Sequence, residues 1–149
     1  MSNVFGTFYQ NCVSLSFYYP ESELRGKFGH IALRNIYGQN APRIPEYGKG
    51  SDYPFSFIWV DGLVEVNTLT IENMERVEEI APVETIRVEP RAKIRNMSVA
   101  HVSHQNKLGV PLPLMRNHGT IENLYLYNLD AGEDQVLVNA GTIGKLVEN

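Results

Sequence analysis

The sequence has little of several features that would narrow its function. It contains a single cysteine, Cys12, in 149 residues, which excludes an intrachain disulfide and any metal site built from several thiolates. Its 13 basic side chains are scattered and the formal net charge is −4, so a basic stripe of the kind that binds nucleic acid is lacking. The mild acidity also gives no attraction to an anionic membrane surface. We therefore predict no nucleic-acid partner.

Long apolar runs are lacking as well, and no segment reaches the length that spans a bilayer. Residues 1–6 show no basic segment followed by an apolar run, so no signal peptide is visible. We predict no membrane insertion. If the protein acts outside a cell, it gets there without a signal visible here, as a virion component would, or the signal lies on a longer parent chain. No break in composition divides the chain, which predicts one domain over residues 1–149. A loop insertion is expected at about 39–54, where prolines and glycines gather.

A short motif recurs along the chain: an apolar residue, a polar residue, asparagine and a second apolar residue. Its best copies lie in segments 120–126, 70–74 and 93–99, and weaker copies contain Asn35 and Asn11. In the last copy Lys145 takes the place of asparagine. The first apolar residues stand at 9, 33, 71, 94, 121 and 143, with gaps of 24, 38, 23, 27 and 22. A period of this length is typical of a solenoid, and the gap of 38 contains the loop insertion.

Strand-like residues around each copy favour an all-β fold, a right-handed parallel β-helix of about six short coils. Parallel strands of successive coils lie about 4.8 Å apart, so equivalent side chains form columns. Asparagine suits a corner between strands because it tolerates a left-handed backbone and bonds to local peptide groups. Stacked amides would then form a ladder. The expected members of this ladder are Asn11, Asn35, Asn73, Asn96 and Asn123. Two apolar columns are expected inside the coil. The first consists of Leu33, Ile71, Ile94, Ile121 and Ile143, and the second of Ile36, Met74, Met97, Leu124 and Leu146.

Two alternatives stay open from the residues alone. Segment 73–80 fits two turns of an amphipathic helix as well as a continued strand, since Met74, Val77 and Ile80 fall on one helical face. An irregular β-sandwich or an α+β domain would also accommodate this helix and the long loop.

The asparagine-centred repeat resembles the right-handed parallel β-helix of pectin-lyase-like proteins, which include phage tailspikes and neck appendages. The resemblance covers nearly the whole chain and brings no catalytic motif with it. It implies a triangular coil of three parallel sheets, and a function centred on long carbohydrates that are bound or cut along the side of the helix. It also implies a homotrimer or a place in a longer chain.

Outward-facing aromatic rings are the candidates for carbohydrate binding. Tyr37, Tyr125 and Tyr127 are expected to point outward beside the inward columns, and Trp59 belongs to a strand-like run over residues 55–60. Such rings stack on sugars and donate hydrogen bonds. An interface between copies, or burial in the case of Trp59, also accounts for these side chains and is favoured over sugar binding.

Carboxylates are the candidates for catalysis, because glycoside hydrolysis uses one carboxyl group as acid and a second as base or nucleophile. Asp61 with Glu65, and Asp130 with Glu133 and Asp134, stand in or beside predicted turns, where acidic groups are usually solvated. No cofactor or metal is expected, since the four histidines have too few companions for a metal site.

These observations together favour a structural or recognition module that binds a host-surface polysaccharide. The alternatives are a polysaccharide lyase or glycoside hydrolase of the same fold, and an adhesin or assembly scaffold without a sugar ligand.

Overall fold

The protein is wound entirely from β-strands over the part that the structure describes. In the computed structural model, residues 1–8, 12–16, 25–40, 56–78, 84–107 and 109–149 are described. Six strands belong to one sheet: β1 (Ser2–Phe8), β3 (Gly26–Asn40), β5 (Val64–Glu78), β7 (Lys93–Asn106), β9 (Thr120–Asp130) and β11 (Thr142–Glu148). Five strands of three residues form a second sheet: β2 (Val13–Leu15), β4 (Ile58–Val60), β6 (Ile86–Val88), β8 (Met115–Asn117) and β10 (Leu137–Asn139).

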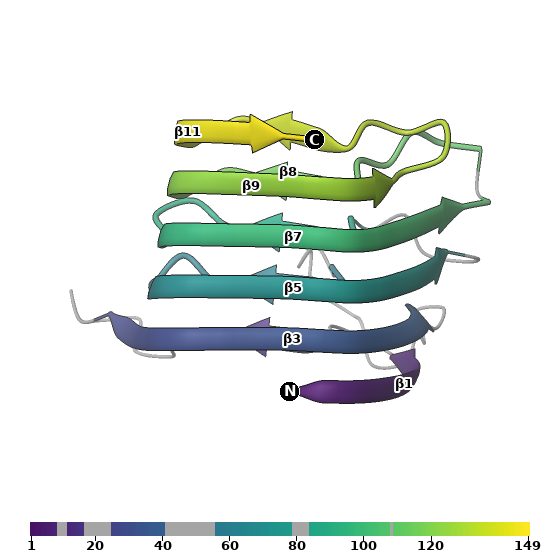
Figure 1. Ribbon diagram of the computed structural model, residues 1–149, viewed down its shortest axis with the longest axis horizontal. Coiled ribbons are helices and arrows are strands. Elements are labelled where there is room, and N and C mark those ends of the chain that lie inside the picture. The colour runs from purple at the N-terminus through teal and green to yellow at the C-terminus, as the bar shows by residue number, and fades with distance from the viewer. Residues whose placement is uncertain (9–11, 17–24, 41–55, 79–83, 108) are drawn as a thin grey trace, which may run out of the picture.

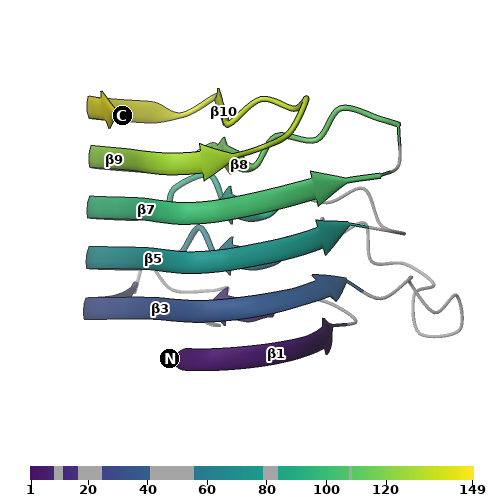
Figure 2. The same ribbon diagram turned by 45° about the vertical axis from the view of Figure 1, so that its right-hand side comes forward.

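The chain alternates between the two sheets, and each sheet grows in chain order. The larger sheet runs β1-β3-β5-β7-β9-β11 and the smaller one β2-β4-β6-β8-β10. All pairings between described strands are parallel. Figure 1 shows the long strands stacked from β1 to β11, and Figure 2 shows them as one curved layer. The prediction of an all-β chain of parallel strands is confirmed, and the arrangement is consistent with a parallel β-helix.

Two expectations about the strands need correction. The described residues form two sheets rather than three, because each long strand bends and remains hydrogen-bonded around its corners. The helix considered for segment 73–80 is wrong over its described part, since β5 continues as a strand to Glu78. Of the expected loop insertion at 39–54, β3 includes residues 39 and 40, and the remainder lies outside the described residues.

The register between β5 and β7 corrects the single asparagine ladder. The motif spacing predicts that Asn73 lies beside Asn96, but the strand partner of Asn96 is Thr68. Met74 accordingly pairs with Val102 and not with Met97. Asn73 and Asn96 therefore belong to different columns. Asn11 lies outside the described residues.

Asn73 and Asn96 belong to different columns because a long strand has two corners, as at Thr68 and Asn73 in β5. One column of corners contains His30, Thr68, Asn96, Asn123 and Lys145. Four residues with a left-handed backbone, φ between +49° and +55°, form a second set of corners: Asn35, Asn73, His101 and Asn128. Neighbouring amides bond within each column, with 3.2 Å from Asn73 Nδ2 to Asn35 Oδ1 and 3.0 Å from Asn123 Nδ2 to Asn96 Oδ1.

The register between β5 and β7 also corrects the expected apolar columns. Leu33 pairs with Ile71 as predicted, but Ile71 then pairs with Val99, while Ile94 pairs with Ile121. The expected pairing thus holds within β3–β5 and within β7–β9–β11 and is broken between β5 and β7. On the last strand, β11, Leu146 is 43% exposed and does not lie inside as predicted. The interior between the two sheets remains almost wholly apolar and buried.

Glycines allow the turns into the long strands to stack closely. A Cβ atom on Gly119 would lie 2.8 Å from the carbonyl oxygens of both Ala92 and Glu89. A Cβ atom on Gly141 would lie 2.2 Å from the carbonyl oxygen of Gly119. These turns therefore fit over one another only without side chains. Over the described ranges the chain has no helix long and apolar enough to cross a membrane.

Candidate functional site

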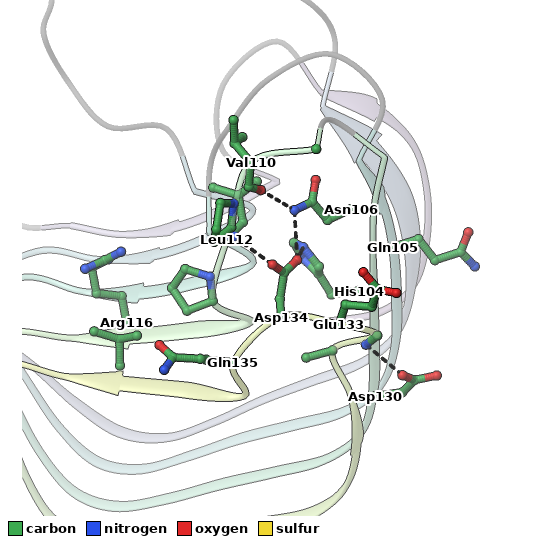
Figure 3. Close-up of a pocket in the computed structure, with 16 residues that line it drawn as sticks. His104, Gln105, Asn106, Val110, Leu112, Arg116, Asp130, Glu133, Asp134 and Gln135 are labelled. Atoms are coloured by element: carbon green, nitrogen blue, oxygen red, sulfur yellow. Dashed lines mark hydrogen bonds and ion pairs between the residues drawn. The ribbon is translucent and has the colours of Figure 1, made fainter.

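A large hollow of about 860 Å³ lies beyond the ends of β7 and β9, where the β7–β8 and β9–β10 connections approach each other (Figure 3). The described residues of these connections supply carboxylate, carboxamide and proline side chains. The polar part of the lining consists of His104, Gln105, Asn106, Arg116, Asp130, Glu133, Asp134 and Gln135. The carboxylates accept hydrogen bonds, the guanidinium donates them and the carboxamides do both, so the large hollow can bind a polar ligand.

Asp134 joins the two connections through its carboxylate. Its Oδ1 accepts the Leu112 backbone N–H at 3.0 Å, and its Oδ2 accepts from Asn106 Nδ2 at 2.8 Å. Its own backbone N–H donates to the carbonyl oxygen of Ala131 at 3.0 Å. Figure 3 shows this carboxylate between the two connections, with both bonds drawn. The side chain is 9% exposed, so one edge of it remains open.

A row of buried polar side chains stands behind Asp134. Arg76 and His104 are paired residues of β5 and β7 that face inward, where the other columns are apolar. Arg76 Nη1 donates to Thr85 Oγ1 at 3.2 Å, and Thr85 Oγ1 is hydrogen-bonded to His104 Nδ1. His104 Nε2 points toward Asp134 Oδ2 at 3.7 Å and has no hydrogen-bond partner.

His104 is neutral at pH 7 because of its surroundings. Burial, and then the charge of Arg76, lower the pKa of His104 to about 4, against the opposite influence of Asp134. A neutral imidazole carries one proton. If that proton were on Nδ1, a lone pair on Nε2 would face the Asp134 carboxylate. The favoured tautomer therefore has Thr85 donating to Nδ1 and places the proton on Nε2, toward Asp134.

The row of threonine, histidine and aspartate has the composition of a catalytic triad but not its accessibility. Thr85 is fully buried, so a substrate in the large hollow cannot reach its hydroxyl group. His104 is also buried, and it lies between Thr85 and Asp134. The row therefore orients Asp134 and does not supply a nucleophile.

The outward face of the smaller sheet continues this hollow. Its middle residues form one column in register: Ser14, Trp59, Arg87, Arg116 and Val138. Arg116 and Val138 also line the large hollow. A ligand that leaves the large hollow along the strand stack therefore meets Arg87 and then Trp59.

Carboxylates pair with the cations of this column. Glu84 Oε1 accepts from Arg116 Nε and, at 3.4 Å, from Arg87 Nη1. Glu89 Oε1 accepts from Arg87 Nε at 2.7 Å and from Trp59 Nε1 at 3.0 Å. These bonds hold the indole in place and leave the column without a large excess of positive charge.

The predicted acidic residues line three different hollows. Asp130 and Asp134 line the same hollow, and Asp130 Oδ1 accepts the Gly132 backbone N–H at 2.9 Å in a turn. Asp61 lines a second hollow of about 380 Å³ together with Trp59, Arg87 and Glu89. Glu65 lines a third, on the larger sheet, and pairs with Lys93 at 3.6 Å. The structure therefore places Asp61 beside Trp59 in one hollow and Glu65 beside Lys93 in another.

The predicted tyrosines lie on the larger sheet, outside the large hollow. Tyr37, Tyr125 and Tyr127 are 47%, 39% and 49% exposed. The Tyr127 ring meets His101 edge to face, with 5.3 Å between ring centroids. Tyr37 lines a shallow depression of about 380 Å³ that also includes His101. Their role in carbohydrate binding stays a prediction.

Sequence reasoning missed five polar residues that line the large hollow: His104, Gln105, Asn106, Arg116 and Gln135. The one available signal was a polar pair, Arg76 and His104, which stand one coil apart in otherwise apolar columns. Among the described residues there is no group of three or more His, Cys, Asp and Glu side chains that could hold a metal ion. Comparison with protein-family models, curated proteins and solved structures finds no match to this chain.

Proposed function

We propose that this protein is a recognition module that binds a host-surface polysaccharide along the side of its coils. The observation that carries the proposal is the hollow of about 860 Å³, lined by carboxylates and carboxamides, which opens beside the outward column of the smaller sheet. Sugar hydroxyl groups both donate and accept hydrogen bonds, and these side chains offer both partners. A site of this size takes one or a few sugar residues.

The column beside the large hollow favours a polymer over a single sugar. Successive strands lie about 4.8 Å apart, so a ligand lying along the stack meets a new outward side chain at every strand. From the large hollow these are Arg116, Arg87 and Trp59, whose indole is held by Glu89. An extended sugar chain can therefore bond in the large hollow and stack on an aromatic ring further along.

Binding is favoured over cleavage because two carboxylates of the large hollow, Asp130 and Asp134, already accept hydrogen bonds from the protein. Both oxygens of Asp134 accept hydrogen bonds from the protein, and Asp130 accepts one within its own turn. A polysaccharide lyase or glycoside hydrolase would need a carboxyl group poised against the sugar bond. A scaffold or adhesin without a sugar ligand would leave the lining of the large hollow without a role.

The same proposal includes the finer identity of the fold and its assembly. We infer a right-handed β-helix of about six coils, of the pectin-lyase-like kind found in phage tailspikes and neck appendages, supported by the parallel coils and asparagine corners. This step is an analogy of fold. A homotrimer in a virion or outside a cell would follow, with Tyr37, Tyr125 and Tyr127 between copies, or the chain would be part of a longer one.

Affinity electrophoresis in gels that contain a polysaccharide tests the function. We expect at least one polymer to retard the protein, and Gln135→Ala and Trp59→Ala to weaken binding about fivefold each, the effect of one lost hydrogen bond or ring contact. Tyr125→Ala is the matched control on the other sheet and should bind as the wild type does. The proposal fails if no polymer retards the protein, or if only Tyr125→Ala abolishes binding. Shortening of the polymer on incubation would instead favour the enzyme.

A further inference from the structure

We propose that the large hollow accepts a neutral sugar residue, two adjacent hydroxyl groups of which donate to the Asp134 carboxylate, and that it rejects uronic acids. This inference rests on the proposed function and adds to it the class of sugar. Three features of the large hollow carry it: the hydrogen-bonding capacity left on Asp134, the charge of the lining, and the buried imidazole behind the carboxylate.

The Asp134 carboxylate has acceptor capacity beyond its protein partners. A carboxylate offers about four lone-pair sites on its two oxygens. Leu112 N–H occupies one site on Oδ1 and Asn106 Nδ2 occupies one on Oδ2. One further site on each oxygen remains, and the exposed edge of the side chain borders the large hollow. Two neighbouring hydroxyl groups on one sugar ring match two acceptor oxygens on one carboxylate.

The charge of the lining opposes an acidic ligand. Asp130, Glu133 and Asp134 all line the large hollow, and Arg116 is the permanently charged cation among the described lining residues. The Arg116 guanidinium is already bonded to Glu84. A uronate carboxylate that entered the large hollow would therefore meet several like charges and only a cation that is already neutralised, and like charges across an interface weaken binding.

The buried imidazole supports the Asp134 carboxylate from the protein side. His104 Nε2–H points at Asp134 from the protein side, and this polar atom is buried without a hydrogen-bond partner. From this side the imidazole keeps the carboxylate oriented, with its exposed edge bordering the large hollow. The hydroxyl groups of a neutral sugar therefore meet an acceptor that is already fixed in place.

Affinity electrophoresis with defined polymers tests the inference. Dextran and mannan are neutral and carry adjacent hydroxyl groups, whereas polygalacturonate carries a carboxylate on each residue. We expect a neutral polymer to retard the wild-type protein and polygalacturonate to bind at least tenfold more weakly. In the double variant Asp130→Asn with Glu133→Gln, the ratio of the two dissociation constants should move about tenfold toward polygalacturonate, because two repelling charges are gone.

The control variant Glu72→Gln with Glu122→Gln removes the same net charge from the larger sheet, and its ratio should equal that of the wild type. The inference is overturned if the wild type binds polygalacturonate as tightly as a neutral polymer, or if the ratio is the same in the double variant and the wild type. It is also overturned if the control variant moves the ratio equally. Absence of binding to all three polymers, in the wild type and in the double variant, overturns the proposed function itself, so the two failures are distinguishable.

Discussion

Protonation of His104 should destabilise the fold as the pH falls. In the folded chain, burial and the Arg76 charge lower the pKa of His104 to about 4, whereas an exposed histidine has a pKa of about 6.5. The unfolded chain therefore binds this proton first, and stability is lost as the pH drops from about 6.5 through 4. The loss attributable to His104 is about 2 kcal/mol at pH 5 and about 3 kcal/mol at pH 3.5, and is absent at pH 7.

The comparison of wild type with His104→Gln isolates this effect, because other groups titrate in both proteins. Urea unfolding from pH 7 to 3.5, followed by the fluorescence of the single tryptophan, gives both free energies of unfolding. The variant loses hydrogen bonds and is less stable at pH 7, but the difference should shrink by about 2 kcal/mol on going to pH 5. A difference that is independent of pH would refute the reasoning, since His104 would then titrate alike in the folded and unfolded chains.

Three further predictions concern the backbone and the core. Gly119→Ala should lower the free energy of unfolding by about 2 kcal/mol, because its Cβ would lie 2.8 Å from two backbone carbonyl oxygens. The control is Gly29→Ala, whose Cβ meets nothing within 4 Å, and it should change that free energy by less than about 0.5 kcal/mol. Asn73→Val should lower the free energy of unfolding by about 2 kcal/mol in the same urea assay, because φ at this residue is +54° and the side-chain hydrogen bond to Asn35 is lost. An unchanged urea midpoint would contradict a strained corner. Burial raises the pKa of the Cys12 thiol to about 11, so mass spectrometry should find alkylation by iodoacetamide at pH 8 slow in buffer and fast in urea, and equal rates would show an accessible thiol.

The residue pattern predicts the parallel coils correctly, but it predicts the register between neighbouring strands only in part. Alternating apolar residues and asparagine corners identify parallel coils, and Asn96 and Asn123 do stack as expected. The pattern fails between β5 and β7 because both corners of a long strand have the same local sequence requirement, two buried apolar residues separated by two polar ones, as in segments 66–69 and 71–74. Asn73 and Asn96 therefore look equivalent in sequence although they occupy different corners. Only hydrogen bonding between strands decides which copies meet.

The large hollow could not be predicted from the sequence, again because it depends on which residues of successive coils meet. Asn106 and Asp134 meet because they stand about one coil apart, on connections of different composition. Asp130 and Asp134 were visible as acidic residues near a turn, but the buried row behind them depends on Arg76 and His104 sharing an inward column. A one-residue error in register would turn these side chains to the other face of the sheet.

Sugar binding in the large hollow is tested most directly by two-dimensional ¹H–¹⁵N NMR during titration with mannotriose and isomaltotriose, neutral oligosaccharides with adjacent hydroxyl groups. Backbone amides of Asn106, Leu112 and Asp134 should shift and saturate with one dissociation constant, while those of Tyr125 and Tyr127 stay in place. Saturable shifts confined to the tyrosine-bearing strand, or no saturable shift with either sugar, would contradict binding in the large hollow.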